Sequence, residues 1–324
     1  MTRHTKHSSL VLLSSVIAGV LLSAATAGGG AGTDCGKRII VSATNNGGTL
    51  ELTTADPIFS HACPGGGLRV VNAGKNAFDK SYTVSCPTDT IRGMGRGTGI
   101  SLSGPNLTVT GCNVDGFGKG IVARGDNILI QNSAAAHSVG DGIVMTDRLS
   151  PLNPNFQGSF LDTCNAVGNG GWGIRIIGNQ IDTTPYGDFA STVSANAKGG
   201  LWAKGLLNNI NTLVATGNNG PGFEVTSRNC CGFNVLTTVQ AVGNTGPGVI
   251  FVGRDDGLNS APLGSGGSIL FFPEALDVSE TIVSSLNGAC PAGALPAPTL
   301  LSQQICAFVA GVRCSDAVLG RCQF

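Results

Sequence analysis

Residues 99–133 read GISLSGPNLTVTGCNVDGFGKGIVARGDNILIQNS, and this stretch contains the pattern that decides the fold. A glycine followed by a short apolar run opens the stretch, recurs 21 residues later at Gly120, and recurs again at Gly142. Between these copies, asparagine followed by an apolar run begins at Asn106 and at Asn127. A period near 22 residues predicts a solenoid, in which each repeat packs on its neighbours.

The repeat continues along most of the chain and indicates which solenoid it is. The glycine-led run returns at four further positions, Gly173, Gly200, Gly222 and Gly248. Each period has two or three short runs of alternating apolar residues and no stretch that suits an amphipathic helix. Three short strands per coil predict an all-β fold, a right-handed parallel β-helix of about 22 residues per coil. Asn106 and Asn127 then occupy one turn of successive coils, where asparagine tolerates the left-handed backbone.

The chain also resembles a known architecture. The segments that carry the resemblance are DCGKRIIV (34–41), HACPGGGLRVV (61–71), SYTVSCPTDTIRGMGRGTGI (81–100) and residues 106–133. They resemble exported proteins with right-handed parallel β-helix repeats, which share the pectate-lyase-like (pectin-lyase-like) architecture. The resemblance covers about Cys35 to Phe272 and implies the fold without an activity. The Gly-His-Gly of polygalacturonases, the Asp-Pro-His-Asp of alginate epimerases and the Arg-x-Pro-x-x-Arg of pectate lyases are missing.

The first 27 residues have the order of a secretory signal peptide. Arg3 and Lys6 precede an apolar run, Leu10 to Leu22, and small residues follow to Ala27. A membrane anchor is the alternative, but the run is shorter than the ~20 apolar residues that a spanning helix needs. We therefore expect a secreted protein, extracellular, periplasmic or on the cell surface, with no later membrane span.

Charge argues against some partners. The chain has 19 basic and 19 acidic residues, and removal of Arg3 and Lys6 leaves 17 basic residues and a formal charge of −2. Nucleic acids and anionic membranes both favour a basic excess, so neither is the expected partner.

The 11 cysteines suggest disulfide-stapled caps at both ends of a coil that spans 28–287. Cys35 and Cys63 flank the first coil. The predicted C-terminal cap, 288–324, contains Cys290, Cys306, Cys314 and Cys322. A metal site is the alternative for these four, although CxxC pairs and histidines are lacking there. Cys112 and Cys164 are predicted to lie two coils, ~9–10 Å, apart, beyond the reach of a disulfide, and to be buried free thiols.

Alternation along the glycine-led strands predicts two columns of outward side chains. One column is Val122, Val144, Arg175, Trp202, Glu224 and Ile250; the other is Arg124, Thr146, Ile177, Lys204, Thr226 and Val252. Arg175, Trp202 and Lys204 would then share one patch. An aromatic face beside cations suits a sugar that carries carboxylates, and an ordinary solvated face is the alternative.

Long insertions follow the glycine-led strands, and they should stack along one edge. Their polar residues are Arg148, Asp182, Tyr186, Asp188, Arg228, Arg254, Asp255 and Asp256. Tyr186 is a further substrate-binding candidate. Asp255 and Asp256 could bind Ca²⁺ or act as acid and base, and a lyase could use Lys204 or Arg228 as its base. A solvated loop is the alternative for the acidic pair.

The stretch HSVGDGIV (137–144) contains a second catalytic candidate, because His137 lies four residues before Asp141. The same place in the preceding coil, VDGFGKGIV (114–122), has a similar glycine-rich turn with an aspartate and no histidine. A structural turn is therefore the competing interpretation.

Two functions remain open. One is the binding or processing of an extracellular, uronate-containing polysaccharide, by a lyase, epimerase or hydrolase reaction if the protein is an enzyme. The other is a non-catalytic structural or adhesive role. Convergence of Arg175, Trp202, Lys204 and the loop acids in one groove would favour the first.

Overall fold

The computed structural model describes most of the repeat region. The described residues are 36–41, 48–73, 77, 80–147, 158–183, 190–206, 208–227, 235–252, 283–285 and 305–308. All of them belong to one compact unit. The predicted signal peptide, 1–27, lies outside them. Within these ranges no helix is long and apolar enough to cross a membrane.

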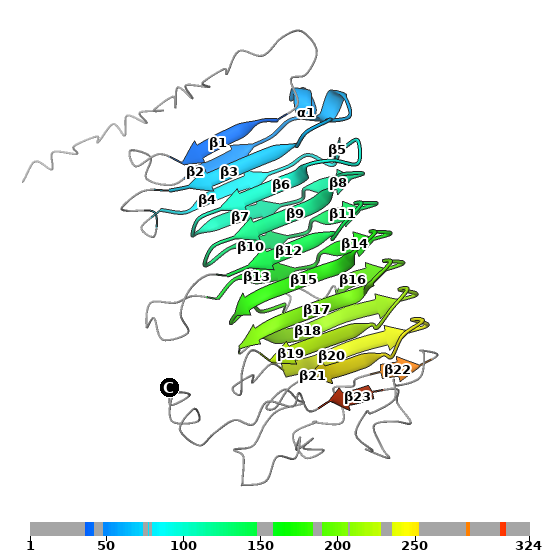
Figure 1. Ribbon diagram of the computed structural model, residues 1–324. Helices are drawn as coiled ribbons and strands as arrows, with labels where there is room; N and C mark the ends of the chain where they lie inside the picture. Colours follow the sequence, from blue (N-terminus) through cyan, green and yellow to red (C-terminus); the bar gives the residue numbers. More distant parts are fainter. Residues whose placement is uncertain are drawn as a thin grey trace, which may run out of the picture. The chain divides into compact units, whose positions relative to one another are not determined.

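Three parallel sheets make up the described fold, with ten, five and eight strands in the ranges above (Figure 1). The long sheet contains β1 (Arg38–Val41), β3 (Leu68–Asn72), β6 (Thr98–Ser103), β9 (Lys119–Arg124), β12 (Ile143–Thr146), β15 (Trp172–Asn179), β17 (Gly199–Leu206), β19 (Phe223–Ser227), β21 (Val249–Val252) and β23 (Ile305–Phe308). The second sheet contains β2 (Gly48–Glu51), β4 (Tyr82–Ser85), β7 (Leu107–Thr110), β10 (Leu129–Gln131) and β13 (Phe160–Asp162). The third sheet contains β5 (Thr90–Arg92), β8 (Asn113–Asp115), β11 (Ala134–Ala136), β14 (Asn165–Val167), β16 (Ser191–Ser194), β18 (Asn209–Thr216), β20 (Val235–Val242) and β22 (Val283–Ser285).

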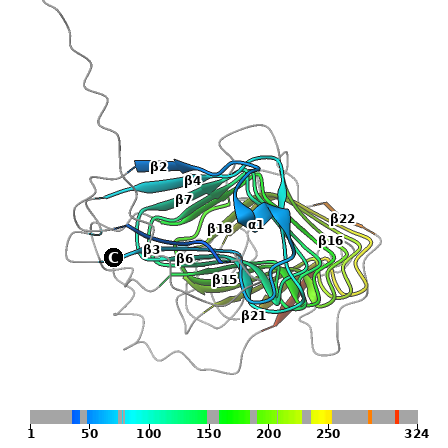
Figure 2. The same ribbon diagram turned by 90° about the horizontal axis from the view of Figure 1, so that it is seen from above.

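The chain visits the three sheets in turn, and each circuit is one coil. One coil follows β6, β7 and β8, and the next follows β9, β10 and β11. Each strand pairs in parallel with the corresponding strand of the next coil, and seen from above the coils superpose (Figure 2). The predicted parallel β-helix with three strands per coil is therefore confirmed, while its right-handed winding stays a prediction.

Apolar side chains from all three sheets fill the interior. In one coil the inward residues are Ile100, Val109 and Val114, and in the next they are Ile121, Ile130 and Ala135; all are at most 1% exposed. Alternation along each strand places these residues inside, because successive side chains point to opposite faces. Each buried valine or isoleucine contributes ~1.5–3 kcal/mol relative to an exposed one, so the stacked columns supply the main stabilisation.

Two asparagine ladders link successive coils. At the outer corner between the long and second sheets, Asn127 Nδ2 donates to Asn106 Oδ1 at 2.7 Å, and both residues have a positive φ. This confirms the predicted stacking of these asparagines. A second, buried ladder comprises Asn169, Asn196, Asn218 and Asn244. The side-chain oxygens of Asn196, Asn218 and Asn244 each accept the backbone N–H of the preceding member at 3.0 Å, and also its side-chain amide at 2.8–2.9 Å.

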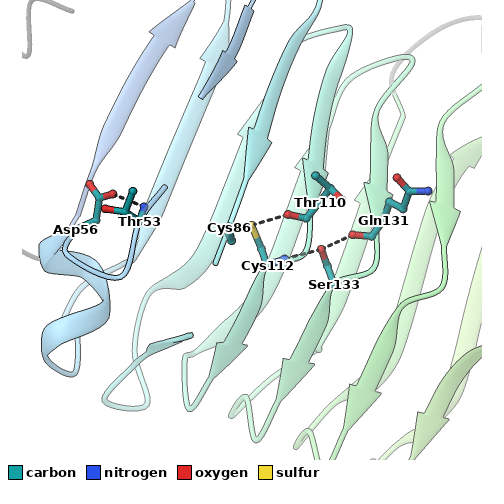
Figure 3. Close-up of a disulfide and its surroundings, with 7 residues drawn as sticks. All are labelled: Thr53, Asp56, Cys86, Thr110, Cys112, Gln131 and Ser133. Atoms are coloured by element: carbon teal, nitrogen blue, oxygen red, sulfur yellow. Dashed lines mark hydrogen bonds between the residues drawn. A yellow bond between two sulfur atoms is a disulfide. The ribbon is translucent and has the colours of Figure 1, made fainter. Parts of the chain in front are cut away.

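One expectation about the cysteines is wrong. Cys112 is not a free thiol, because it forms a disulfide with Cys86, and the two Cα atoms are 4.8 Å apart (Figure 3). In the next coil, Ser133 takes the place of Cys112. The backbone N–H of Cys112 donates a hydrogen bond to the Ser133 hydroxyl at 3.1 Å. Cys164 is free and buried, as expected. Burial raises the pKa of the Cys164 thiol to about 12.

The predicted caps lie only partly within the described residues. Cys63 is disulfide-bonded. Cys35, Cys290, Cys314 and Cys322 lie outside the described residues. Cys306 lies on β23, which pairs in parallel with β21 and extends the long sheet into the segment predicted as a C-terminal cap.

A short helix, α1 (Pro57–Ser60), lies at the N-terminal end of the stack (Figure 1). Asp56 precedes the helix, pairs with Lys37 at 2.5 Å, and accepts the Thr53 amide at 2.8 Å (Figure 3 shows the Thr53 bond). Burial alone would raise the pKa of Asp56, but these hydrogen bonds and the lysine charge lower it overall.

Candidate functional site

The outer face of the long sheet brings the predicted patch together. Strand register places Arg175 beside Trp202, and Trp202 beside Glu224, on successive strands β15, β17 and β19. Lys204 lies in the next column, between Ile177 and Thr226. The pairing of β9, β12, β15, β17, β19 and β21 confirms the register of both predicted columns, although Val122 and Val144 of the first column are buried.

Arg175 stacks on Trp202 and is held from its other side by Asp141. The guanidinium carbon of Arg175 lies 4.9 Å from the centroid of the Trp202 ring, within the range of a cation–π contact. Its Nη1 lies 3.3 Å from Asp141 Oδ2, and the other oxygen of Asp141 accepts the Trp172 amide at 3.0 Å. The Asp141 side chain is only 10% exposed, whereas that of Arg175 is 38% exposed. Asp141 therefore orients Arg175, and the guanidinium still reaches solvent.

Glu224 lies on the opposite side of Trp202. The indole Nε1 donates a hydrogen bond to Glu224 Oε1 at 3.0 Å. Glu224 is half-buried, and burial raises the pKa of its carboxyl group above the ordinary value of 4.5, although the indole bond acts in the opposite direction. A carboxyl group whose pKa is raised in this way is better suited to proton transfer near neutral pH than a solvated one.

Trp172 also belongs to this face, although the sequence did not single it out. Gly173 and Ile174 both face the interior: a Cβ at Gly173 would meet Asn196 of the buried ladder, and Ile174 is fully buried. Trp172 therefore faces outward, where it is partly exposed. Its ring lies against Gly199 on β17, because a Cβ there would be 2.3 Å from Trp172 Cζ3. Both tryptophans of the chain thus lie on this face, on neighbouring strands.

Cations outnumber carboxylates on the described outer face of the long sheet. The cations are Arg38, Arg69, Lys119, Arg124, Arg175 and Lys204, and all except the half-buried Arg175 are exposed. The carboxylates are Asp141, which is buried against Arg175, and Glu224. The chain as a whole has equal numbers of basic and acidic residues. This face therefore has a local positive charge that the composition conceals.

His137 does not pair with Asp141. Its Nδ1 lies 2.7 Å from Oδ1 of Asp115 in the preceding coil, and the His137 and Asp115 side chains are 69% and 40% exposed. The φ of His137 is 48°, and Gly116 and Gly168 at the same turn of the neighbouring coils also have positive φ. The geometry thus places His137 in a turn of the coil, apart from the tryptophan face, the part of the outer face of the long sheet that carries Trp172 and Trp202.

The loop candidates are mostly outside the described residues. Tyr186, Arg228, Asp255 and Asp256 lie outside, as do the other charged positions of the insertions except Asp182. Asp182 Oδ1 accepts a hydrogen bond from Asn209 Nδ2 at 3.2 Å. Among the residues that the structure describes, no group of three or more His, Cys, Asp or Glu side chains could hold a metal ion. The Ca²⁺ site at Asp255 and Asp256 therefore stays a prediction.

Comparisons with known proteins add little to this geometry. No protein-family model and no curated protein matches the chain. Among solved structures, the A-module of the mannuronan C-5 epimerase AlgE4 from Azotobacter vinelandii is similar, with 12% identity and a TM-score of 0.29, over 67% of this chain and 72% of that one. A similarity of this size says nothing about the function of this chain.

Proposed function

We propose that this protein binds an acidic extracellular polysaccharide along the outer face of its long sheet. The observation that carries the proposal is the stacking of Arg175 on Trp202, beside Trp172, on a face where cations outnumber carboxylates. A tryptophan ring offers an apolar surface to the C–H face of a sugar. The arginine fork and the exposed Lys204 can bind a uronate carboxylate. The disulfide between Cys86 and Cys112 is typical of proteins from oxidising compartments, where such polymers occur.

Binding to purified mature protein tests this proposal. Retardation in gels that contain alginate, pectate, hyaluronan or neutral glycans should show retention by one or more acidic polymers, and retention should weaken with salt. Loss of a charge-assisted hydrogen bond costs ~1.5–3 kcal/mol, so Arg175→Gln should weaken binding about 10-fold to 100-fold. Trp202→Ala should weaken it as well.

Arg92→Gln is the matched control, because Arg92 is an exposed arginine on β5 of the third sheet. It removes the same charge from another face and should leave retention unchanged. The proposal is wrong if no acidic polymer is retained, or if Arg92→Gln has the same effect as Arg175→Gln.

A catalytic role is a second candidate, favoured by Glu224. A half-buried carboxyl group with a raised pKa next to a sugar platform could move a proton at a bound uronate. In a lyase reaction the base takes the C5 proton, the C4–C5 double bond forms, and the glycosidic oxygen at C4 leaves with a proton from an acid. In an epimerase reaction a proton returns to C5 from the opposite face and no bond of the polymer breaks.

Glu224→Gln separates catalysis from binding. If the protein is an enzyme, this variant should lose unsaturated ends, new reducing ends or C5 proton exchange, whichever the wild type produces. Glu51→Gln is the control, because Glu51 is an exposed carboxylate on β2 of the second sheet. Retention by an acidic polymer without any of these products would leave a binding protein, and silence in every assay would favour a structural role.

A further inference from the structure

A groove lies on a different sheet from the tryptophan face. It has a volume of 470 Å³, within the range of small-ligand sites. Its lining residues are Ser81, Asn106, Thr108, Asn127, Leu129, Gly158 and Phe160. They lie on or next to β4, β7, β10 and β13, four neighbouring strands of the second sheet, so the groove extends about 14 Å along the stack.

The floor of this groove is apolar. Leu129 pairs in register with Thr108 on one side and with Phe160 on the other, which places the leucine and the phenylalanine side by side on the outer face. Both are partly exposed. Gly158 borders this floor and lets the backbone pass close to Gln180, because a Cβ there would lie 2.1 Å from the carbonyl oxygen of Gln180. A flat apolar surface of this kind can pack against the C–H face of a sugar ring.

The wall of the groove is polar and carries no charge. The partly exposed Asn106 and Asn127 lie along it, joined by their 2.7 Å side-chain hydrogen bond, and Ser81 and Thr108 line the same space. None of the seven lining residues is ionisable. Amides and hydroxyls next to an apolar floor match the hydroxyl groups and C–H face of an uncharged sugar, and the lining residues include no cation to neutralise a carboxylate.

An extended peptide is a poorer match for this groove. Such a peptide binds by adding a strand to a free sheet edge. Here β4, β7, β10 and β13 already pair with one another, so their backbone groups are used within the sheet.

We propose that this groove is a second carbohydrate site, which binds uncharged sugar residues. It is independent of the long sheet, so the protein could hold a neutral glycan and an acidic polymer at the same time. The proposal does not rest on the function proposed above, and either can fail alone.

The test uses the purified protein and uncharged hexasaccharides of the cello-, manno- and xylo- series, by isothermal titration calorimetry and saturation-transfer NMR. At least one should bind the wild type. Phe160→Ala should weaken its binding about tenfold. Asn127→Gly should weaken it about threefold to tenfold, because it removes the amide yet suits the φ of 50° at this position.

Asn132→Gly is the matched control. Asn132 is exposed, has a φ of 48°, and lies outside the groove, so the same substitution in the same backbone conformation should leave binding unchanged. Retention by acidic polymers, measured in parallel, should be unchanged in Phe160→Ala and reports separately on the long sheet. Circular dichroism checks that each variant is folded. Absence of binding by every neutral hexasaccharide, or equal binding by Asn127→Gly and wild type, would overturn the proposal.

Discussion

Replacement of Asn196 by alanine should strongly destabilise the protein, because this side chain joins three coils. Its oxygen accepts hydrogen bonds from the backbone N–H and the side-chain amide of Asn169, and its own amide donates to Asn218 Oδ1 and to the carbonyl oxygen of Ala166. All three asparagines are at most 1% exposed. The substitution would leave two donors of Asn169 without their acceptor in a dry interior.

The expected loss follows from these two donors. A buried donor that loses its acceptor costs ~1–3 kcal/mol, so the free energy of unfolding should fall by about 2–6 kcal/mol. This is a large part of the ~5–15 kcal/mol that stabilises a typical domain. Urea unfolding can be followed by tryptophan fluorescence, because Trp172 and Trp202 lie on β15 and β17, the strands that follow Asn169 and Asn196 in the chain.

Ser138 offers a control at the head of the same ladder. Its backbone N–H donates to Asn169 Oδ1 at 2.9 Å, but its buried hydroxyl has no hydrogen-bond partner among the described residues. Ser138→Ala should therefore cost no stability. The reasoning fails if Asn196→Ala loses less than about 1 kcal/mol, or if Ser138→Ala loses as much as Asn196→Ala.

Three further predictions concern the disulfide, Glu224 and the free thiol. Conversion of Cys86 and Cys112 to serine should lower the free energy of unfolding by about 3.5 kcal/mol, the chain-entropy value for a separation of 26 residues; an unchanged urea midpoint would contradict it. Because burial raises the pKa of Glu224, the folded state binds this proton more tightly than the unfolded state, and stability is lost as the pH rises above the ordinary value of 4.5. Glu224→Gln should therefore have a melting temperature equal to or higher than that of the wild type at pH 7, and this difference should disappear below about pH 4.5. A higher melting temperature for the wild type at pH 7 would contradict the raised pKa of Glu224. Cys164, whose thiol pKa is raised to about 12 by burial, should resist iodoacetamide at pH 8 and react only in denaturant, as peptide mass spectrometry would show.

The sequence predicted the outer columns of the long sheet because two simple rules apply there. The period fixes which strands stack, and alternation fixes which side chains face outward. The irregular spacings between the glycine-led runs after Gly142 did not disturb this prediction, because the extra residues lie between strands. Arg175, Trp202 and Lys204 therefore lie where the pattern placed them.

The same rules missed features in which the chain departs from them. Alternation fails where Gly173 and Ile174 face inward in succession, which hid Trp172. Strand register places Ser85 beside Thr110, and therefore Cys86 beside Gly111. The disulfide partner of Cys86 is the next residue, Cys112, so a search for cysteines at the same position of successive coils does not find this pair.

The buried ladder did leave a signal in the sequence. Each of its asparagines precedes a glycine-led run by four residues, as in Asn196 and Gly200. These stretches resemble ordinary loops when read one at a time, and the signal appears only when the coils are aligned. The hydrogen bond between the Trp202 indole and Glu224 could not be predicted from the sequence, because a column shows which residues are neighbours and not which of them form hydrogen bonds.

The buried ladder also has a consequence for how such a chain can grow. Each asparagine makes the same bonds to the coil before it, so a tandem copy of one coil would meet its neighbours through contacts that already exist. Gene duplication within this region could therefore lengthen the molecule by ~4.8 Å per added coil while leaving every other coil in place. The distance between binding groups on the outer faces would then change in fixed steps. Added or removed coils could therefore match this distance to the repeat length of a polymer, by evolution or by design.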